Sequence, residues 1–234
     1  MPMYFDPTYL LMVALPALIL SGLAQMYVRS NYSKWSQVRN SRNMTGADVA
    51  QSLVQKNGLR VNVASTPGEL SDHYDPSSGV VRLSQGVAGT PSVAAMAIAA
   101  HEFGHVQQHQ QGSILITLRT FLVPAVQIAP AFSYLMIIGG LLLNFAGLAW
   151  LGVALFGISV AFMVLTLPVE IDASTRGMKM LNDGGFFTSE QDRQGARAVL
   201  TAAAFTYIAA ALTSVLQLLY YVSLVSRSSR RSSY

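Results

Sequence analysis

Residues 120–169 read TFLVPAVQIAPAFSYLMIIGGLLLNFAGLAWLGVALFGISVAFMVLTLPV and contain no Asp, Glu, Lys or Arg. A helix needs about 20 apolar residues to cross a bilayer, so this stretch is long enough for two passes. Residues 198–226 are also free of charge and could form one more pass, and residues 8–28 form a further apolar segment. The sequence therefore predicts a mainly α-helical, multi-pass membrane protein with about four transmembrane helices.

The composition agrees with a membrane protein. Of the 234 residues, 52% are hydrophobic and only 11% are charged, whereas soluble domains carry about 25% charged residues. The chain has no cysteine, which excludes a disulfide framework, a thiolate nucleophile and a Cys-type zinc site. The net charge of +4 is explained by basic residues beside the apolar segments, and no nucleic-acid-binding module is present. The expected partner is the lipid bilayer of the cell membrane.

Charges flanking the first apolar segment predict its orientation. Only Asp6 precedes it, so the basic region that begins a signal peptide is missing and we expect a retained anchor. Arg29, Lys34 and Arg39 follow it. The positive-inside rule then puts the N-terminus outside and the next portion of the chain in the cytoplasm. Four spans leave the basic end of the chain outside, so the last apolar segment could instead lie in the interface or re-enter.

Residues 30–113 form the largest polar portion, and local patterns predict an α+β structure there. A helix should begin after Thr45 and stop at Gly58. Residues 59–63 and 79–84 are expected as short strands, joined through turn residues at 75–79. The second strand is a candidate edge with which an extended substrate could pair. Thr90 is a possible N-cap for a helix that ends near Gly112.

That last helix contains the sequence His101-Glu102-Phe103-Gly104-His105, an H-E-x-x-H motif. Residues four apart lie on one face of a helix, so His101 and His105 can direct two imidazoles at one zinc ion. Glu102 is then placed to take a proton from the attacking water, as the general base of a peptidase.

A catalytic zinc site usually has three protein ligands. The first acidic residue after Glu102 is Glu170, followed by Asp172. Two membrane passes between His105 and Glu170 would return the chain to the same side, so we expect Glu170 to be the third ligand. Asp172 is not expected to bind the same ion, because residues two apart on a helix point in different directions. We expect it to pair with Arg176 instead.

The chain has two other histidines, His73 and His109, that could belong to the site. His109 repeats the spacing of four, but it lies about 12 Å along the helix from His101, too far to share one coordination sphere. A solvated His109 is therefore expected. His73 could donate a hydrogen bond to an oxyanion, orient a ligand or only stabilise its turn, and the sequence favours the structural role.

With these residues identified, the chain resembles the YugP-like neutral zinc metallopeptidase family, a group of bacterial membrane zinc metallopeptidases. The similarity covers nearly the whole chain, and its most specific blocks are 100–105 and 168–174. The resemblance implies zinc on His101, His105 and Glu170, with Glu102 catalytic. It implies a small zincin-like catalytic portion and a peptide or protein substrate, and it identifies neither the physiological substrate nor a protein partner.

Three alternatives stay open. An intramembrane site-2-type protease would need the motif inside a span, whereas this motif is followed by the polar residues 107–111. A non-catalytic zinc-binding scaffold would be expected to lack Glu102. A transporter usually has ionisable residues within its spans.

The sequence thus predicts six parts: an N-terminal membrane anchor at 1–29, a catalytic portion with the H-E-x-x-H helix at 30–113, two transmembrane helices at 114–168, a loop or helix with the third zinc ligand at 169–197, a last transmembrane helix at 198–226 and a disordered tail at 227–234. The active site is predicted on the cytoplasmic side.

Overall fold

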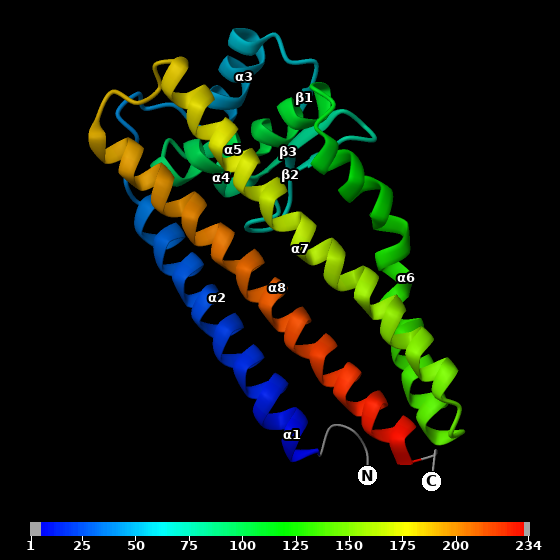
Figure 1. Cartoon of the computed structure of the whole chain (residues 1–234). Helices are drawn as coiled ribbons and strands as arrows, with labels where there is room; N and C mark the ends of the chain where they lie inside the picture. Colours follow the sequence, from blue (N-terminus) through cyan, green and yellow to red (C-terminus); the bar gives the residue numbers. More distant parts are fainter. Residues whose placement is uncertain (1–5, 232–234) are drawn as a thin grey trace. The chain divides into compact units, whose positions relative to one another are not determined.

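The computed structural model describes residues 6–231. It is mainly helical, with one small three-stranded sheet. In chain order, its elements are α1 (Pro7–Tyr9), the π-helical turn η2 (Leu10–Ala14), α2 (Leu15–Ser36), α3 (Gly46–Asn57), β1 (Asn62–Thr66), β2 (His73–Asp75), β3 (Val80–Ser84), α4 (Gln85–Gly89), α5 (Val93–Gln110), α6 (Ile114–Leu142), α7 (Ala146–Asp183) and α8 (Glu190–Arg231) (Figure 1).

The chain forms two compact units. We call Met1–Ala24, Leu118–Leu167 and Thr206–Tyr234 the apolar unit, and Gln25–Thr117 with Pro168–Phe205 the site unit. Within the described residues, four helices are long and apolar enough to cross a membrane, which is the number that the sequence predicts. They span Pro7–Ser36, Ile114–Leu142, Ala146–Asp183 and Glu190–Ser229.

The apolar unit buries a modest core and exposes much apolar surface. Val13, Ile137 and Val225 are among its buried residues, while Phe121 and Leu142 are each 78% exposed. Such exposed apolar surface is unusual for a protein in water and suits contact with lipid.

Helices α6 and α7 form a hairpin whose turn lies around Asn144. Asn144 has φ 52°, a left-handed conformation that asparagine tolerates better than most residues. Gly140 has a different role, because a Cβ there would lie 2.4 Å from the backbone nitrogen of Ala149. The glycine lets the two helices approach closely.

The site unit contains the sheet, whose strand order is β1-β3-β2. β3 pairs in parallel with β1 and antiparallel with β2. The strand at residues 80–84 is therefore central, and the prediction that it offers a free edge to a substrate is wrong. The short strand β2 was not predicted, because turn residues surround it in the sequence. It pairs with β3 on the side opposite β1, so both sides of β3 are occupied. The free edges belong to β1 and β2.

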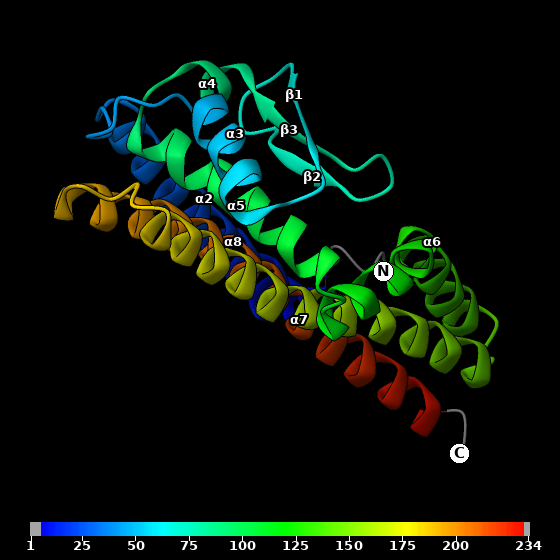
Figure 2. The ribbon, with the colours of Figure 1, turned by 90° about the horizontal axis from the view of Figure 1, so that it is seen from above.

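Helix α5 is the central element of the site unit. It packs against α3 and the sheet through a core that includes Leu53, Leu83 and Phe103. At its N-terminal end it contacts Trp35 of α2 and Ala196 of α8. Figure 2 shows α5 between the sheet and α7. A helix covered on so many sides can hold its side chains in fixed positions.

Capping explains where the helices of the site unit begin. The Thr45 prediction is confirmed: Thr45 and Asp48 form a reciprocal capping box, and Gly58 ends α3 in the left-handed conformation. The predicted N-cap at Thr90 is wrong. Ser92 caps α5, because its hydroxyl accepts a hydrogen bond from the backbone N–H of Ala95 at 3.1 Å.

Other boundaries also differ from the predictions. The strand expected at 59–63 lies at Asn62–Thr66. The segment at 169–197, expected as a loop or helix, is mostly helical, since α7 continues to Asp183 and α8 begins at Glu190. The tail expected to be disordered from 227 continues α8 to Arg231, and residues 232–234 lie outside the described part of the chain.

Candidate metal centre

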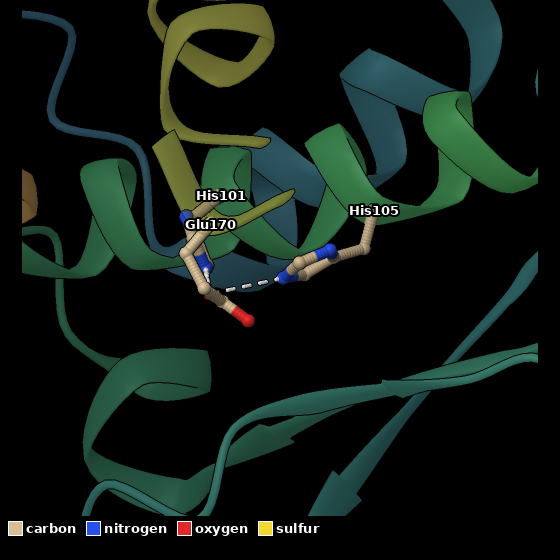
Figure 3. Close-up of side chains that lie close together, drawn as sticks. All are labelled: His101, His105 and Glu170. Carbon is tan, nitrogen blue, oxygen red and sulfur yellow. Dashed lines mark ion pairs between the residues drawn. The ribbon is translucent and has the colours of Figure 1, made fainter. Parts of the chain in front are cut away.

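His101, His105 and Glu170 form a compact cluster in the site unit. The Nε2 atoms of His101 and His105 lie 3.2 and 3.4 Å from the Oε2 atom of Glu170. The rings of the two histidines are nearly perpendicular, at 84°, with their centroids 4.8 Å apart. Figure 3 shows both imidazoles, from α5, pointing at the carboxylate from α7. Residues 69 positions apart thus meet as the sequence predicts.

The donor set fits a divalent transition metal. One potential ligand atom from each residue lies within 4.8 Å of the other two. Two imidazole nitrogens and one carboxylate oxygen are typical zinc ligands, and three protein ligands leave a fourth position open. The side chain of Glu170 is only 3% exposed. A carboxylate buried to this extent needs cationic or hydrogen-bonding neighbours to offset its desolvation.

A close helix crossing brings Glu170 to the histidines. A Cβ at Gly104 would lie 2.1 Å from the carbonyl oxygen of Ala173, and a Cβ at Gly177 would lie 2.7 Å from the carbonyl oxygen of Ala100. Each helix therefore presents a glycine where the other helix's backbone passes. Gly104 lies inside the H-E-x-x-H motif. This residue of the motif therefore allows the close approach of α7 that brings Glu170 to the histidines.

Each histidine has a second polar partner on its Nδ1 atom. Nδ1 of His101 is 3.1 Å from the hydroxyl of Ser174, and Nδ1 of His105 is 3.0 Å from Oε1 of Gln108. The Nε2 atoms are thereby left to face Glu170. Such outer contacts normally orient metal-binding histidines and fix their tautomers.

Asp172 lies beside the cluster. As expected, it pairs with Arg176, whose Nε lies 2.7 Å from the carboxylate. It also accepts a hydrogen bond at 2.8 Å from Nε2 of Gln108, which connects it indirectly to His105. The structure thus separates Glu170 from Asp172: Glu170 faces the histidines and Asp172 faces the residues around them.

Glu102 is 7% exposed. Burial raises the pKa of its carboxyl, although the positive charges that His101 and His105 can carry act in the opposite direction. The negative charge of Asp72 also raises this pKa. Asp72 itself accepts hydrogen bonds from the backbone N–H and the hydroxyl of Ser84, at 2.7 and 3.1 Å. A carboxyl whose pKa is raised toward neutrality is suited to exchange protons with water.

The remaining histidines lie outside the cluster. His109 is exposed and makes an edge contact with the ring of Tyr74, with the centroids 6.0 Å apart. Nδ1 of His73 lies 2.8 Å from the carbonyl oxygen of Ser71, which agrees with the structural role that the sequence favours.

Four neighbours of the cluster were missed by the sequence reasoning: Asp72, Gly104, Gln108 and Ser174. Ser174 and Gln108 had an available signal, because they lie four residues after Glu170 and three residues after His105, on the same helix faces. The roles of Asp72 and Gly104 depend on contacts between segments distant in sequence.

Comparisons with known proteins agree with this site. Residues 9–226 match the family described as "Putative neutral zinc metallopeptidase". The chain is also 42% identical over 211 residues to "Putative membrane protease YugP" of Bacillus subtilis (strain 168), an alignment that covers 90% of this chain and 93% of the relative. No solved structure shows significant similarity to the chain. The family match includes both the α5 and the α7 contributions to the cluster.

Proposed function

This chain belongs to the neutral zinc metallopeptidase family, and on that premise we propose that it is a multi-pass membrane metallopeptidase that hydrolyses peptide bonds. One zinc ion per chain would be held by His101, His105 and Glu170. The observation that carries the proposal is the convergence of the two Nε2 atoms on one buried carboxylate, at 3.2 and 3.4 Å. The buried Glu102 follows His101 directly, so two of the three proposed ligands and the proton acceptor lie within about one turn of α5.

When bound, zinc supplies a Lewis acid that polarises the scissile carbonyl and lowers the pKa of water to about 7. Glu102 takes the proton of the attacking water and then delivers it to the leaving amine. Its raised pKa favours both steps, because a carboxyl that ionises closer to neutral pH is a stronger base and can return the proton. His101, His105 and Glu170 would hold the zinc ion on the helix that carries Glu102.

The arrangement of the site unit supports a zincin-like catalytic portion. The motif helix α5 packs on a small mixed sheet, and the third ligand comes from a later helix. Helix α5 is absent from the four apolar helices that could span a membrane, among residues 6–231. This favours catalysis in water or at the membrane surface over a site-2-type reaction within the bilayer. The presence of Glu102 likewise favours an enzyme over a non-catalytic zinc-binding scaffold.

The expected location is the cell membrane, with the active site on the cytoplasmic side. Residues 146–169 of α7 are free of charge, and Glu170 follows directly. The third ligand therefore lies where an apolar helix would leave the hydrocarbon layer. Peptides or proteins close to the membrane surface are the substrates that such a site could reach.

Metal content of the detergent-purified protein tests this proposal. Elemental mass spectrometry should find zinc near one per chain in the wild type and a large loss in Glu170→Ala. Zinc retained fully by Glu170→Ala would move the third ligand elsewhere. A wild-type protein that binds no zinc even after reconstitution would overturn the proposed function.

A further inference from the structure

Gln108 is a fully buried polar residue, with 0% exposure, located three residues after His105 on α5. Its side-chain oxygen lies 3.0 Å from Nδ1 of His105. Its side-chain nitrogen donates to the backbone carbonyl of Val169 and to Oδ2 of Asp172, both at 2.8 Å. Every polar atom of the amide is therefore engaged, and the partners come from both helices that build the metal centre.

These partners determine which way the amide points. A backbone carbonyl can only accept hydrogen bonds, and the same holds for an ionised carboxylate. The NH₂ end of Gln108 must therefore face Val169 and Asp172, which leaves its oxygen toward His105. That oxygen cannot donate, so the proton of the neutral imidazole has to be on Nδ1 of His105. Nε2 then carries the lone pair, and this is the atom directed at Glu170.

Arg176 holds Asp172, the carboxylate that accepts a hydrogen bond from Gln108. Its Nε lies 2.7 Å from Oδ2 of Asp172, and its Nη1 donates to Oε1 of Gln111 at 2.5 Å. A carboxylate paired with a guanidinium offers only acceptors, so Asp172 accepts from both Arg176 and Gln108. The partner of His101 differs, because the hydroxyl of Ser174 can either donate or accept. Of the two motif histidines, His105 alone has a neighbour that dictates its tautomer.

We propose that Gln108 is a positioning residue of the metal centre, which sets the tautomer and ring orientation of His105 and ties it to the turn of α7 that carries Glu170. This inference rests on the proposed zinc function. The bond to Val169 joins α5 to the residue immediately before Glu170, so one amide fixes two ligands relative to each other. Loss of an outer partner typically weakens metal binding about 10- to 100-fold.

The test is zinc affinity, measured by competition with a chromophoric chelator on detergent-purified protein. Gln108→Met has nearly the same volume but no hydrogen bonds, and it should bind zinc about 10- to 100-fold more weakly than the wild type. Gln107→Met is the matched control. Gln107 also links α5 to α7, since it accepts from Arg176 at 3.3 Å, yet no hydrogen bond to a ligand is found for it among the described residues. Its zinc affinity should stay within about twofold of the wild type, below the 10-fold minimum expected for a lost outer partner.

A double variant tests the direction of the hydrogen bonds. In Gln108→Glu with Asp172→Asn, residue 108 still accepts from His105 and residue 172 now donates to it, whereas the hydrogen bond to the Val169 carbonyl is lost. This variant should bind zinc more tightly than Gln108→Met and keep the visible absorption spectrum of the wild-type cobalt derivative. A residue that only fills space would give the opposite order, with the isosteric Met tolerated.

The outcomes are distinct. Wild-type affinity in Gln108→Met would overturn the inference, while a wild type that binds no zinc would refute the proposed function instead. If Gln108→Met does not fold, as judged by circular dichroism, the double variant decides. A loss of about 100-fold or more in the folded double variant would overturn the inference, because residue 108 still accepts from His105 there, and a smaller loss would support it.

Discussion

Replacing Gly104 by alanine should weaken zinc binding through the crossing of α5 and α7. The added Cβ would lie 2.1 Å from the carbonyl oxygen of Ala173, whereas Cβ atoms essentially never approach another atom within 3.0 Å. One helix must therefore shift by about 0.9 Å at this point. Metal–ligand distances tolerate only about 0.2 Å, so zinc can bind only if the helices stay close and the clash persists.

The size of the effect follows from the cost of overpacking, which is typically about 1–3 kcal/mol. Without metal the helices can relax apart and avoid most of this cost, but zinc binding restores it. The loss should therefore appear in the zinc dissociation constant. At about 1.4 kcal/mol for each factor of ten, the expected increase in Kd is roughly 5- to 150-fold, measured by chelator competition on detergent-purified protein.

Two further alanine variants make a graded series. At Gly177 the Cβ would lie 2.7 Å from the carbonyl oxygen of Ala100, so the required shift is only about 0.3 Å and the effect should be smaller. Gly157, also in α7, is the matched control, because a Cβ there meets nothing within 4 Å. Unchanged affinity in Gly104→Ala, or an equal loss in Gly157→Ala, would refute the reasoning.

The remaining predictions concern chemistry. Glu102→Gln should keep zinc but abolish hydrolysis of a quenched fluorescent peptide, and turnover by a zinc-loaded variant would contradict the mechanism. Asp72→Asn should move the acid limb of the pH–rate profile to lower pH, because the Asp72 charge raises the pKa of Glu102; an unmoved limb would argue against this coupling. Burial alone would lower the pKa of His105, but its contact with Glu170 outweighs burial and raises the pKa above the ordinary 6.5. Protons compete with zinc for this imidazole, so zinc affinity should already decline above pH 6.5 as the pH is lowered, and affinity constant down to pH 6.5 would be inconsistent with the raised pKa.

Sequence periodicity and composition were sufficient to predict the apolar helices and the clustering of His101, His105 and Glu170. Long uncharged stretches indicate apolar helices because hydrocarbon tolerates few charges, and this depends little on tertiary contacts. Glu170 could be proposed as the third ligand because acidic residues are so scarce that it is the first after Glu102. The sheet was harder: β2 has only three residues, and its place beside β3 depends on pairing between segments.

Gln108 illustrates what the sequence could not reveal. It stands among the polar residues that follow the motif, and the sequence favours water or an interface for that segment. The structure buries it completely because α7 crosses at this point and offers a carbonyl and a carboxylate. Whether a glutamine is exposed or buried depends on that crossing, and the residues that make it are about 60 positions away along the chain.

The crossing itself has a pattern in α7 that is evident once the structure is available. Glu170, Ala173, Ser174 and Gly177 follow the spacing of three and four that places residues on one helix face. That face carries the proposed ligand Glu170, the hydroxyl partner of His101, a glycine that admits the backbone of Ala100, and Ala173, whose carbonyl oxygen passes Gly104. Packing and metal chemistry are therefore encoded by the same stripe. A larger side chain at Gly177 would push α7 away from α5 and move Glu170 away from the histidines, so zinc binding should depend on the size of this residue as well as on the three clustered side chains.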